Sequence, residues 1–442
     1  MSAPLGTFFA RSCSAVERAR PYSASGRVTA LVGSAMRVAG LEAPVGALVN
    51  VADGSAHGLA AEVVGFDDSQ CLLLPLAAPE GLRAGARVQL SVEHARPLNG
   101  PGCLGRVIDG LGRPVDGGTA LPRAAFSRRA QIASPLRRRR IEQPLDLGIR
   151  ALNALLTVGV GARLGLFAGS GVGKSTLLGQ IAQGCDADCI VIGLIGERGR
   201  EVREFIERDL GAALSRSVIV AATSDETPAL RRRAAWLATE LAQSLRDAGR
   251  QVLLLVDSLS RFAAAQREIG LAAGEPPATR GFPPSVWSAL PQLLERAGNG
   301  EGAGSITGIY TVLVEADDPE DPIADACRSF LDGHIVLSRR LAERSQFPAI
   351  DLLASISRVM PDVMPAEGLA LAMRARAALA READVEDLVS VGAYRPGSDA
   401  RIDQALKLAP RIRAFMSQPR GERASLHESV AALRTALETE SA

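Results

Sequence analysis

The stretch that decides the fold runs from Arg163 to Ala182 and reads RLGLFAGSGVGKSTLLGQIA. Its first part, Arg163–Phe167, has the apolar texture of a buried strand, and its last part, Thr176–Ala182, has the pattern of a helix. The glycines between them allow backbone N–H groups to curl around phosphate oxygens, and the N-terminus of the helix adds a positive dipole end. The order strand, glycine-rich loop, helix therefore predicts a phosphate-binding loop.

The loop itself, Ala168-Gly-Ser-Gly-Val-Gly-Lys-Ser175, assigns chemistry to individual side chains. Lys174 is expected to neutralise the β- and γ-phosphates of ATP, and Ser175, at the motif position, to reach Mg²⁺, with Thr176 as the alternative hydroxyl. Ala168 stands where the strict motif has a glycine, and we expect the loop to close unless that position requires a positive φ. The predicted nucleotide-binding residues of the loop are Gly169, Ser170, Gly171, Val172, Gly173, Lys174, Ser175 and Thr176.

A second motif supplies a carboxylate for the metal ion. Val252-Leu-Leu-Leu-Val-Asp257 is an apolar run that ends in an acid, which predicts a buried central strand with Asp257 at its carboxyl end. There Asp257 can hold the water shell of Mg²⁺. Such a run is common by itself, but together with the upstream phosphate loop it indicates a nucleotide hydrolase.

The pattern of apolar and polar residues along the chain changes twice around these motifs. Short β-rich runs from Gly26 to Val92, punctuated by Gly, Asp and Pro, predict a small closed barrel. From about Leu145 to Met364, apolar runs alternate with helical segments, which predicts an α/β core with a mostly parallel sheet covered by helices. The remainder is rich in Ala, Leu and Arg at helical spacing and predicts a helical domain. The strand candidates are Arg27–Val32, Val45–Val51, Leu59–Val64, Cys71–Leu76 and Arg87–Val92 in the barrel, and Arg163–Phe167, Ile190–Ile195, Val218–Ala222, Val252–Val256, Ile306–Val314 and His334–Leu337 in the core.

Composition restricts the functional classes. The chain has 442 residues, of which 47% are hydrophobic, so it can form two or three domains. A formal net charge of +1 and an aromatic content of 4% argue against nucleic acid as a partner. The run Arg137–Arg140 is accordingly expected to be a solvated linker. No stretch of sequence approaches the roughly 20 apolar residues of a membrane span, so we expect a cytoplasmic protein whose membrane contacts are peripheral.

Hydrolysis also needs a carboxylate that orients the attacking water. Gly196-Glu-Arg-Gly-Arg-Glu201 follows the strand candidate Ile190–Ile195, so Glu197 is expected at the carboxyl edge of the sheet. At this point the sequence resembles the catalytic subunit of the rotary ATPases and its relatives, the ATPases of type III protein export. The resemblance implies that Glu197 is the catalytic base and that Arg198 contacts the γ-phosphate. Glu201 is the alternative base.

The resemblance extends from Arg27 to Pro419 and implies two more arginine roles. Asp257-Ser-Leu-Ser-Arg-Phe262 is similar to the family segment whose arginine reaches toward the γ-phosphate, which assigns Arg261. Ala354-Ser-Ile-Ser-Arg-Val-Met360 matches the segment that carries a trans-acting arginine finger, so Arg358 is expected to enter a neighbour's site. A structural salt bridge is the alternative for Arg358.

Two aromatic residues are implied at the adenine base. Phe347, in Phe347-Pro348, falls where the family stacks a ring on adenine, and a simple core aromatic is the alternative. Phe415, in Phe-Met-Ser-Gln-Pro419, is expected to close the other side of the base.

Three functions compete within this resemblance: a protein-export ATPase, a synthase catalytic subunit and an RNA-translocating hexamer. The balanced charge and scarce aromatics disfavour the RNA enzyme. Val391-Gly-Ala-Tyr-Arg-Pro-Gly-Ser-Asp399 lacks the acidic loop that synthase subunits present to their rotor, so export is favoured. The segments Ala265–Pro277, Arg280–Val286 and Asp332–Arg339 are also typical of export ATPases, and the phosphate loop with Glu142–Gly148 and Ser390–Asp399 favours a flagellar over an injectisome system.

The resemblance also implies an assembly. We expect a homo-hexamer that engages a central coiled-coil stalk, chaperone–cargo complexes and the export gate at the inner membrane, with ATP and Mg²⁺ and without nucleic acid. Residues 1–24, where Phe8 and Phe9 accompany several arginines, are expected to dock a dimeric negative regulator or an anionic membrane surface, the alternative being a frayed terminus. The expected division is 1–24 docking segment, 25–93 barrel, 94–365 RecA-like P-loop ATPase domain and 366–442 helical domain.

Overall fold

The computed structural model describes residues 25–55, 58–67, 69–91, 98–123, 134–314 and 321–438. The predicted docking segment 1–24 lies outside these residues. The chain forms two compact units: one extends to Arg96 and includes Ala272–Gly274, and the other comprises Pro97–Leu271 and Glu275–Ala442.

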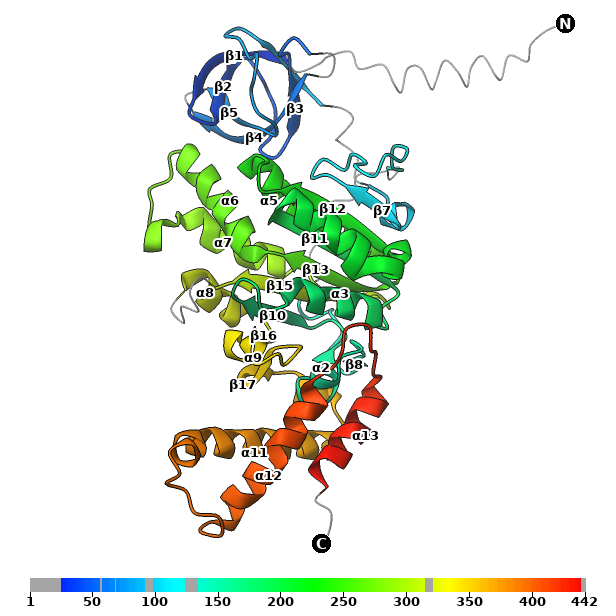
Figure 1. Cartoon of the computed structure of the whole chain (residues 1–442). Coiled ribbons are helices and arrows are strands. Elements are labelled where there is room, and N and C mark those ends of the chain that lie inside the picture. The colour runs from blue at the N-terminus through cyan, green and yellow to red at the C-terminus, as the bar shows by residue number, and fades with distance from the viewer. Residues whose placement is uncertain are drawn as a thin grey trace, which may run out of the picture. The chain divides into compact units, whose positions relative to one another are not determined.

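The first unit is a closed barrel, as predicted (Figure 1). Its strands follow one another around the barrel in the order β1-β2-β5-β4-β3-β6. Side chains alternate between interior and solvent, and the interior ones, such as Met36 and Leu73, are fully buried. Sequence patterns missed β2, because Arg37 interrupts its apolar residues. The strands are β1 Ser25–Val32, β2 Ala35–Ala39, β3 Leu48–Val51, β4 Leu59–Asp67, β5 Gln70–Pro75 and β6 Arg87–Leu90.

The second unit is built on an extended sheet with the strand order β17-β16-β10-β15-β13-β11-β12-β7 (Figure 1). Neighbouring strands in this order run parallel except for β17, which is antiparallel to β16, and the short β14 pairs antiparallel with β15. The mostly parallel core that the sequence predicted is therefore confirmed. The strands are β7 Arg106–Ile108, β10 Arg163–Ala168, β11 Cys189–Glu197, β12 Ser217–Thr223, β13 Gln251–Asp257, β14 Gly298–Asn299, β15 Ser305–Leu313, β16 Gly333–Leu337 and β17 Ile350–Ser357.

Helices bury both faces of this sheet, which explains the near-continuous apolar runs of its strands. Ile190 and Ile192 of β11 join a core with Leu177 and other residues of α3, whereas Val191 joins a separate core with Leu241 of α5. The α-helices between β10 and the C-terminal helices are α3 Lys174–Gly184, α4 Gly199–Glu204, α5 Pro228–Asp247, α6 Leu259–Ala272, α7 Pro284–Leu294, α8 Pro322–Phe330, α9 Arg339–Glu343 and α10 Met360–Val363.

The C-terminal helices extend the α3-side core. Ala375 of α11 (Ala366–Ser390), Ile412 of α12 (Ala400–Met416) and Leu433 of α13 (Leu426–Leu437) are fully buried in it. The predicted helical domain is present. Among the residues that the structure describes, no helix is both long and apolar enough to cross a membrane. The remaining elements are α2 Arg150–Leu155, the strand pair β8 Pro144–Leu145 and β9 Val158–Gly159, and the short helical turns η2 Gly100–Cys103, η3 Phe205–Leu210, η4 Gly211–Arg216 and η5 Thr279–Gly281.

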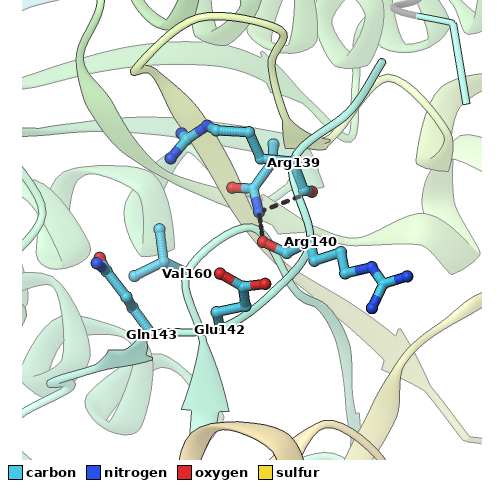
Figure 2. Close-up of a pocket in the computed structure, with 6 residues that line it drawn as sticks. Arg139, Arg140, Glu142, Gln143 and Val160 are labelled. Atoms are coloured by element: carbon cyan, nitrogen blue, oxygen red, sulfur yellow. Dashed lines mark hydrogen bonds between the residues drawn. The ribbon is translucent and has the colours of Figure 1, made fainter. Parts of the chain in front are cut away.

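The arginine run is not the freely solvated linker that we expected. Arg138 donates to the carbonyls of Glu295 and Ala297, and Arg139 donates to those of Ala303 and Gly304. These contacts attach the run to the strand pair β14–β15. Figure 2 shows the side chains of Arg139 and Arg140 pointing in opposite directions beside Glu142, where they line a pocket of about 250 Å³.

Candidate functional site

The phosphate loop leaves the sheet at the carboxyl end of β10. Ala168 is the last residue of the strand, and α3 begins at Lys174. Gly171 and Gly173 have φ angles of 79° and 89°, a left-handed backbone that favours glycine. Ala168 is not among the described residues with a positive φ, so this position does not require the glycine of the strict motif.

Lys174 bridges two carboxylates that come from different strands. Its Nζ lies 2.6 Å from Oδ1 of Asp257 and 3.2 Å from Oε1 of Glu197. Because β11 and β13 are neighbours in the sheet, with Leu194 opposite Asp257, both acids reach the same carboxyl edge beside the loop. The structure thus brings together the lysine, the expected metal-binding acid and the expected base.

The burial of this cluster changes the proton affinity of its members. Burial, together with the charge of Asp257, raises the pKa of Glu197 to about 7, although Lys174 opposes the shift. A hydrogen bond with Glu201 raises it further. For Lys174, burial by itself lowers the pKa, but the charges of Asp257 and Glu197 outweigh burial and the net shift is upward. A carboxyl group with a pKa near neutrality suits a general base.

Asp257 has another partner that sequence reasoning missed. The Thr311 hydroxyl on β15 lies 2.6 Å from Oδ1 of Asp257 and 3.3 Å from the carbonyl oxygen of Val256. Thr311 is fully buried, so its hydroxyl has to be paired within the protein. The sequence contained a weak signal only, a polar residue within the strand candidate Ile306–Val314, which gains meaning once β15 is known to lie beside β13.

The side chain of Arg261 can approach the strand end at Glu197 because the preceding residue, Gly196, has no side chain. Gly196 has a φ of 72°, and a Cβ at this position would lie 3.1 Å from Cβ of Arg261 and 3.2 Å from its Cγ. The side chain of Arg198 is 81% exposed and pairs with Glu201 at 3.6 Å. The stem of Arg261 therefore packs against the strand that carries Glu197, whereas Arg198, next to Glu197 in the chain, extends into solvent.

The two predicted adenine aromatics differ in their surroundings. The ring of Phe347 is 44% exposed and lies beside the phosphate loop. Its Cδ1 is only 3.5 Å from the point that a Cβ on Gly173 would occupy. Phe415 is 7% exposed and belongs to the core. The chain after Phe415 reaches Phe347 through the backbone N–H of Gln418, which donates to the Phe347 carbonyl at 2.9 Å.

Arg358 lies far from the site of its own chain. It follows Ser357, which pairs with Gly333 at the start of β16, whereas Leu337 at the other end of β16 pairs with Ala168 of β10. The two ends of β16 are roughly 13 Å apart along the strand. Arg358 therefore sits at the amino edge of the parallel strands and the phosphate loop at the carboxyl edge.

The oxygen donors of the site fit Mg²⁺. This ion is usually held by one or two carboxylates, with phosphate oxygens and water completing its shell. Asp257 supplies a carboxylate and the exposed Ser175 a hydroxyl at the edge of the loop. No cluster of three or more His, Cys, Asp or Glu able to hold a metal occurs in the described ranges.

Comparison with known proteins agrees with this geometry. Residues 148–357 match the nucleotide-binding domain of the ATP synthase alpha/beta family, and residues 364–435 match the C-terminal domain of the type III secretion ATPase EscN. The chain is 51% identical to the flagellum-specific ATP synthase of Pseudomonas aeruginosa, with 93% of each chain covered. The chain belongs to the type III export ATPase family.

Relatives from both branches of the type III export ATPases are similar to this chain. The type 3 secretion system ATPase of Xanthomonas euvesicatoria is 50% identical over 93% of each chain. The solved structure of the assembled ATPase EscN from enteropathogenic E. coli superposes with a TM-score of 0.87 at 43% identity, covering 93% of this chain and 100% of EscN. The match of the C-terminal helices to EscN confirms the preference for an export ATPase over a synthase subunit.

Proposed function

We propose that this protein hydrolyses Mg-ATP and that the free energy of this hydrolysis drives flagellar type III protein export. The observation that carries the proposal is the bridge from Lys174 to both Glu197 and Asp257, because it brings together the three side chains proposed as phosphate-binding cation, base and metal-binding acid. The relatives named flagellum-specific ATP synthase support the export role.

The chemistry follows from the positions of these groups. Lys174 exchanges its carboxylate partners for the β- and γ-phosphates, while the N–H groups of residues 169–176 surround the phosphate oxygens. Glu197 then accepts a proton from the water that attacks the γ-phosphorus. Arg261 and Arg198 provide positive charge at the departing phosphoryl group. Asp257 and Ser175 would hold Mg²⁺, which neutralises charge between the β- and γ-phosphates when bound.

The direct test is release of inorganic phosphate from ATP by the purified protein. We expect turnover that requires Mg²⁺ and is lost in Lys174→Ala, with Lys407→Ala on helix α12 as the matched control. Lys174→Ala turning over at the wild-type rate would refute the proposed site.

We also infer a hexameric ring in which Arg358 serves the neighbouring site. Support comes from the position of Arg358 at the amino edge of the sheet and from the solved structure of assembled EscN. EscN has also been solved with its central stalk EscO at 42% identity to this chain, and we infer a comparable stalk here. Chaperone–cargo complexes and the export gate complete the set of partners, at the cytoplasmic side of the inner membrane.

The division 1–24, 25–93, 94–365 and 366–442 belongs to the same proposal. The barrel and the match of residues 364–435 to a C-terminal domain support its inner boundaries. Residues 1–24 are proposed to dock a dimeric regulator. Deleting residues 2–20 should then abolish capture of that regulator while ATP turnover is retained, and undiminished capture would refute the docking role.

A virulence-type secretion system is the second candidate, because the Xanthomonas relative matches as closely as the Salmonella typhimurium flagellar relative, both at 50% identity. Complementation decides between them. We expect the gene to restore motility to a strain that lacks its flagellar ATPase and not to restore effector secretion to a strain that lacks its injectisome ATPase. The opposite pattern would move the assignment to the injectisome.

A further inference from the structure

A turn of its own chain holds Arg358. The backbone N–H of Arg358 donates to the carbonyl of Asp332 at 2.9 Å, and its guanidinium donates to the carbonyls of Leu331 and Arg328, both at 3.3 Å. These carbonyls lie at the C-terminal end of α8, where unpaired helix carbonyls favour a cation. Because a guanidinium has five N–H donors, two carbonyl contacts leave other donors for an anion.

The same turn is attached to β10 at two points. The guanidinium carbon of Arg328 lies 4.9 Å from the centre of the Phe167 ring, and Oδ2 of Asp332 accepts a hydrogen bond from the Arg163 N–H at 2.9 Å. Phe167 is only 2% exposed, and a cation over a shielded ring is held more firmly than one over an exposed ring. The strand that leads into the phosphate loop therefore also fixes the turn that holds Arg358.

The Phe167 ring fits against the turn because residue 165 is a glycine. A Cβ at Gly165 would lie 2.3 Å from Cε2 of Phe167 and 3.0 Å from Cδ1 of Leu331. The ring meets His334 of β16 edge-on, with 5.6 Å between ring centres. Nε2 of His334 is 3.0 Å from the carbonyl oxygen of Ala354 on β17. The ring thus packs against His334 of β16, and His334 in turn contacts β17.

We propose that Arg328 is a positioning residue for Arg358. Stacked on Phe167, Arg328 fixes the turn from Arg328 to Asp332, and the carbonyls of this turn orient the guanidinium that Arg358 offers to the neighbouring subunit. The inference rests on the proposed finger role of Arg358. Arg328 acts through the turn and does not touch the nucleotide.

Three variants test the contact. Arg328→Met keeps an unbranched apolar stem and removes the guanidinium, whereas Arg328→Lys keeps a cation over the ring. Arg340→Met is the matched control, because it removes an exposed arginine that pairs with Glu386 on another surface. We expect Arg328→Met to lower kcat of the assembled protein ~10-fold, since small displacements of a catalytic group have large effects. Arg328→Lys should recover most of this loss.

The isolated protomer separates positioning from a general structural role. ATP affinity and the thermal midpoint of Arg328→Met should match those of the control variant. Phe167→Leu removes the aromatic face from the other side of the contact and should also lower kcat with unchanged ATP affinity. Wild-type kcat in both Arg328→Met and Phe167→Leu, or a loss of ATP affinity that accounts for the change, would overturn the inference.

A double variant identifies the residue through which Arg328 acts. If Arg328 affects turnover only by positioning Arg358, adding Arg328→Met to Arg358→Ala should lower turnover no further. The same tenfold drop in both backgrounds would contradict the proposal. Normal turnover in Arg358→Ala alone would instead refute the finger, so the failure of the proposed function is distinguishable from the failure of this inference.

Discussion

The ammonium group of Lys174 lies 2.6 Å from the carboxylate of Asp257, so the cation of the phosphate loop pairs with the acid that is expected to serve the metal. Pairing is needed because both side chains are largely buried, and an unpaired charge there would be costly. In the proposed mechanism, Mg-ATP would supply phosphates to Lys174 and a metal ion to Asp257. Nucleotide binding would then exchange one compensated set of charges for another, and would release Glu197 from the lysine in the same step.

Replacing Glu197 with Gln removes the proton acceptor and keeps the shape of the side chain. We expect turnover to fall by ~10²-fold or more, while ATP binding persists because Lys174 and the loop are unchanged. Steady-state phosphate release and binding of a fluorescent nucleotide measure the two properties. Glu201→Gln is the comparison variant, since Glu201 is the alternative base and is 45% exposed. Normal turnover in Glu197→Gln with a defect in Glu201→Gln would transfer the role to Glu201.

The pH dependence of kcat/KM should report the ionisation of Glu197. Its pKa is raised to about 7, and the base is active only as the carboxylate, so activity is full above this pH and falls as pH decreases through it. The expected slope is about tenfold per pH unit on the acid side. Because the hydrogen bond with Glu201 raises the pKa of Glu197, Glu201→Gln should move the acid limb to lower pH. An acid limb that stays in place in Glu197→Gln would disprove the assignment.

The sequence predicted the parts of this site that follow directly from a strand end. Lys174 and Asp257 were identified because the phosphate loop and the apolar run each have a strict local pattern. The position of Glu197 at the same edge followed from its strand candidate, and the resemblance supplied its role as the base. Thr311 could not be predicted, because its contact with Asp257 depends on the order of strands in the sheet.

β17 and the contacts of the arginine run also escaped prediction. β17 was not recognised, although it leads directly to Arg358, because its polar and apolar residues do not form a continuous buried run. The contacts of the arginine run could not be predicted, since a local pattern does not reveal that distant carbonyls before and after β14 accept its hydrogen bonds. The missing information was the pairing of β17 with β16 in one case and the carbonyl contacts of the arginine run in the other. Local sequence periodicity does not report such long-range contacts.

Arg358 and Lys174 should be separable in mixed rings. Arg358→Ala should leave ATP binding by protomers intact but abolish the turnover gained on assembly, because Arg358 lies at the sheet edge opposite its own phosphate loop. Mixing it with Lys174→Ala protomers creates interfaces that join an intact loop to an intact finger, so activity should partly return. Mixed rings verified by mass and still inactive would show that Arg358 does not act in trans.

The exposed ring of Phe347 should contribute to affinity and not to stability. Phe347→Ala is expected to weaken ATP binding on the order of tenfold through lost stacking, and Phe347→Tyr to bind normally. Phe415→Leu serves as comparison: its buried ring predicts a lower thermal midpoint. Equilibrium nucleotide titration and thermal unfolding measure both variants. An equal loss of ATP affinity in Phe415→Leu would favour the base contact that the resemblance implied for Phe415.

Thr311 provides the last test, because it acts on the site only through Asp257. Thr311→Val keeps the volume of the side chain but removes the hydroxyl that lies 2.6 Å from Oδ1 of Asp257. A buried carboxylate that loses a hydrogen-bond donor is destabilised by about 1–3 kcal/mol, and its orientation toward the metal is no longer fixed. We expect a higher Mg²⁺ concentration for half-maximal ATPase activity, with Thr311→Ser close to wild type because it keeps the hydroxyl. Magnesium titrations of both variants at saturating ATP measure this shift. Identical Mg²⁺ dependence in Thr311→Val and the wild-type protein would show that Thr311 merely fills the core and that Asp257 needs no second partner.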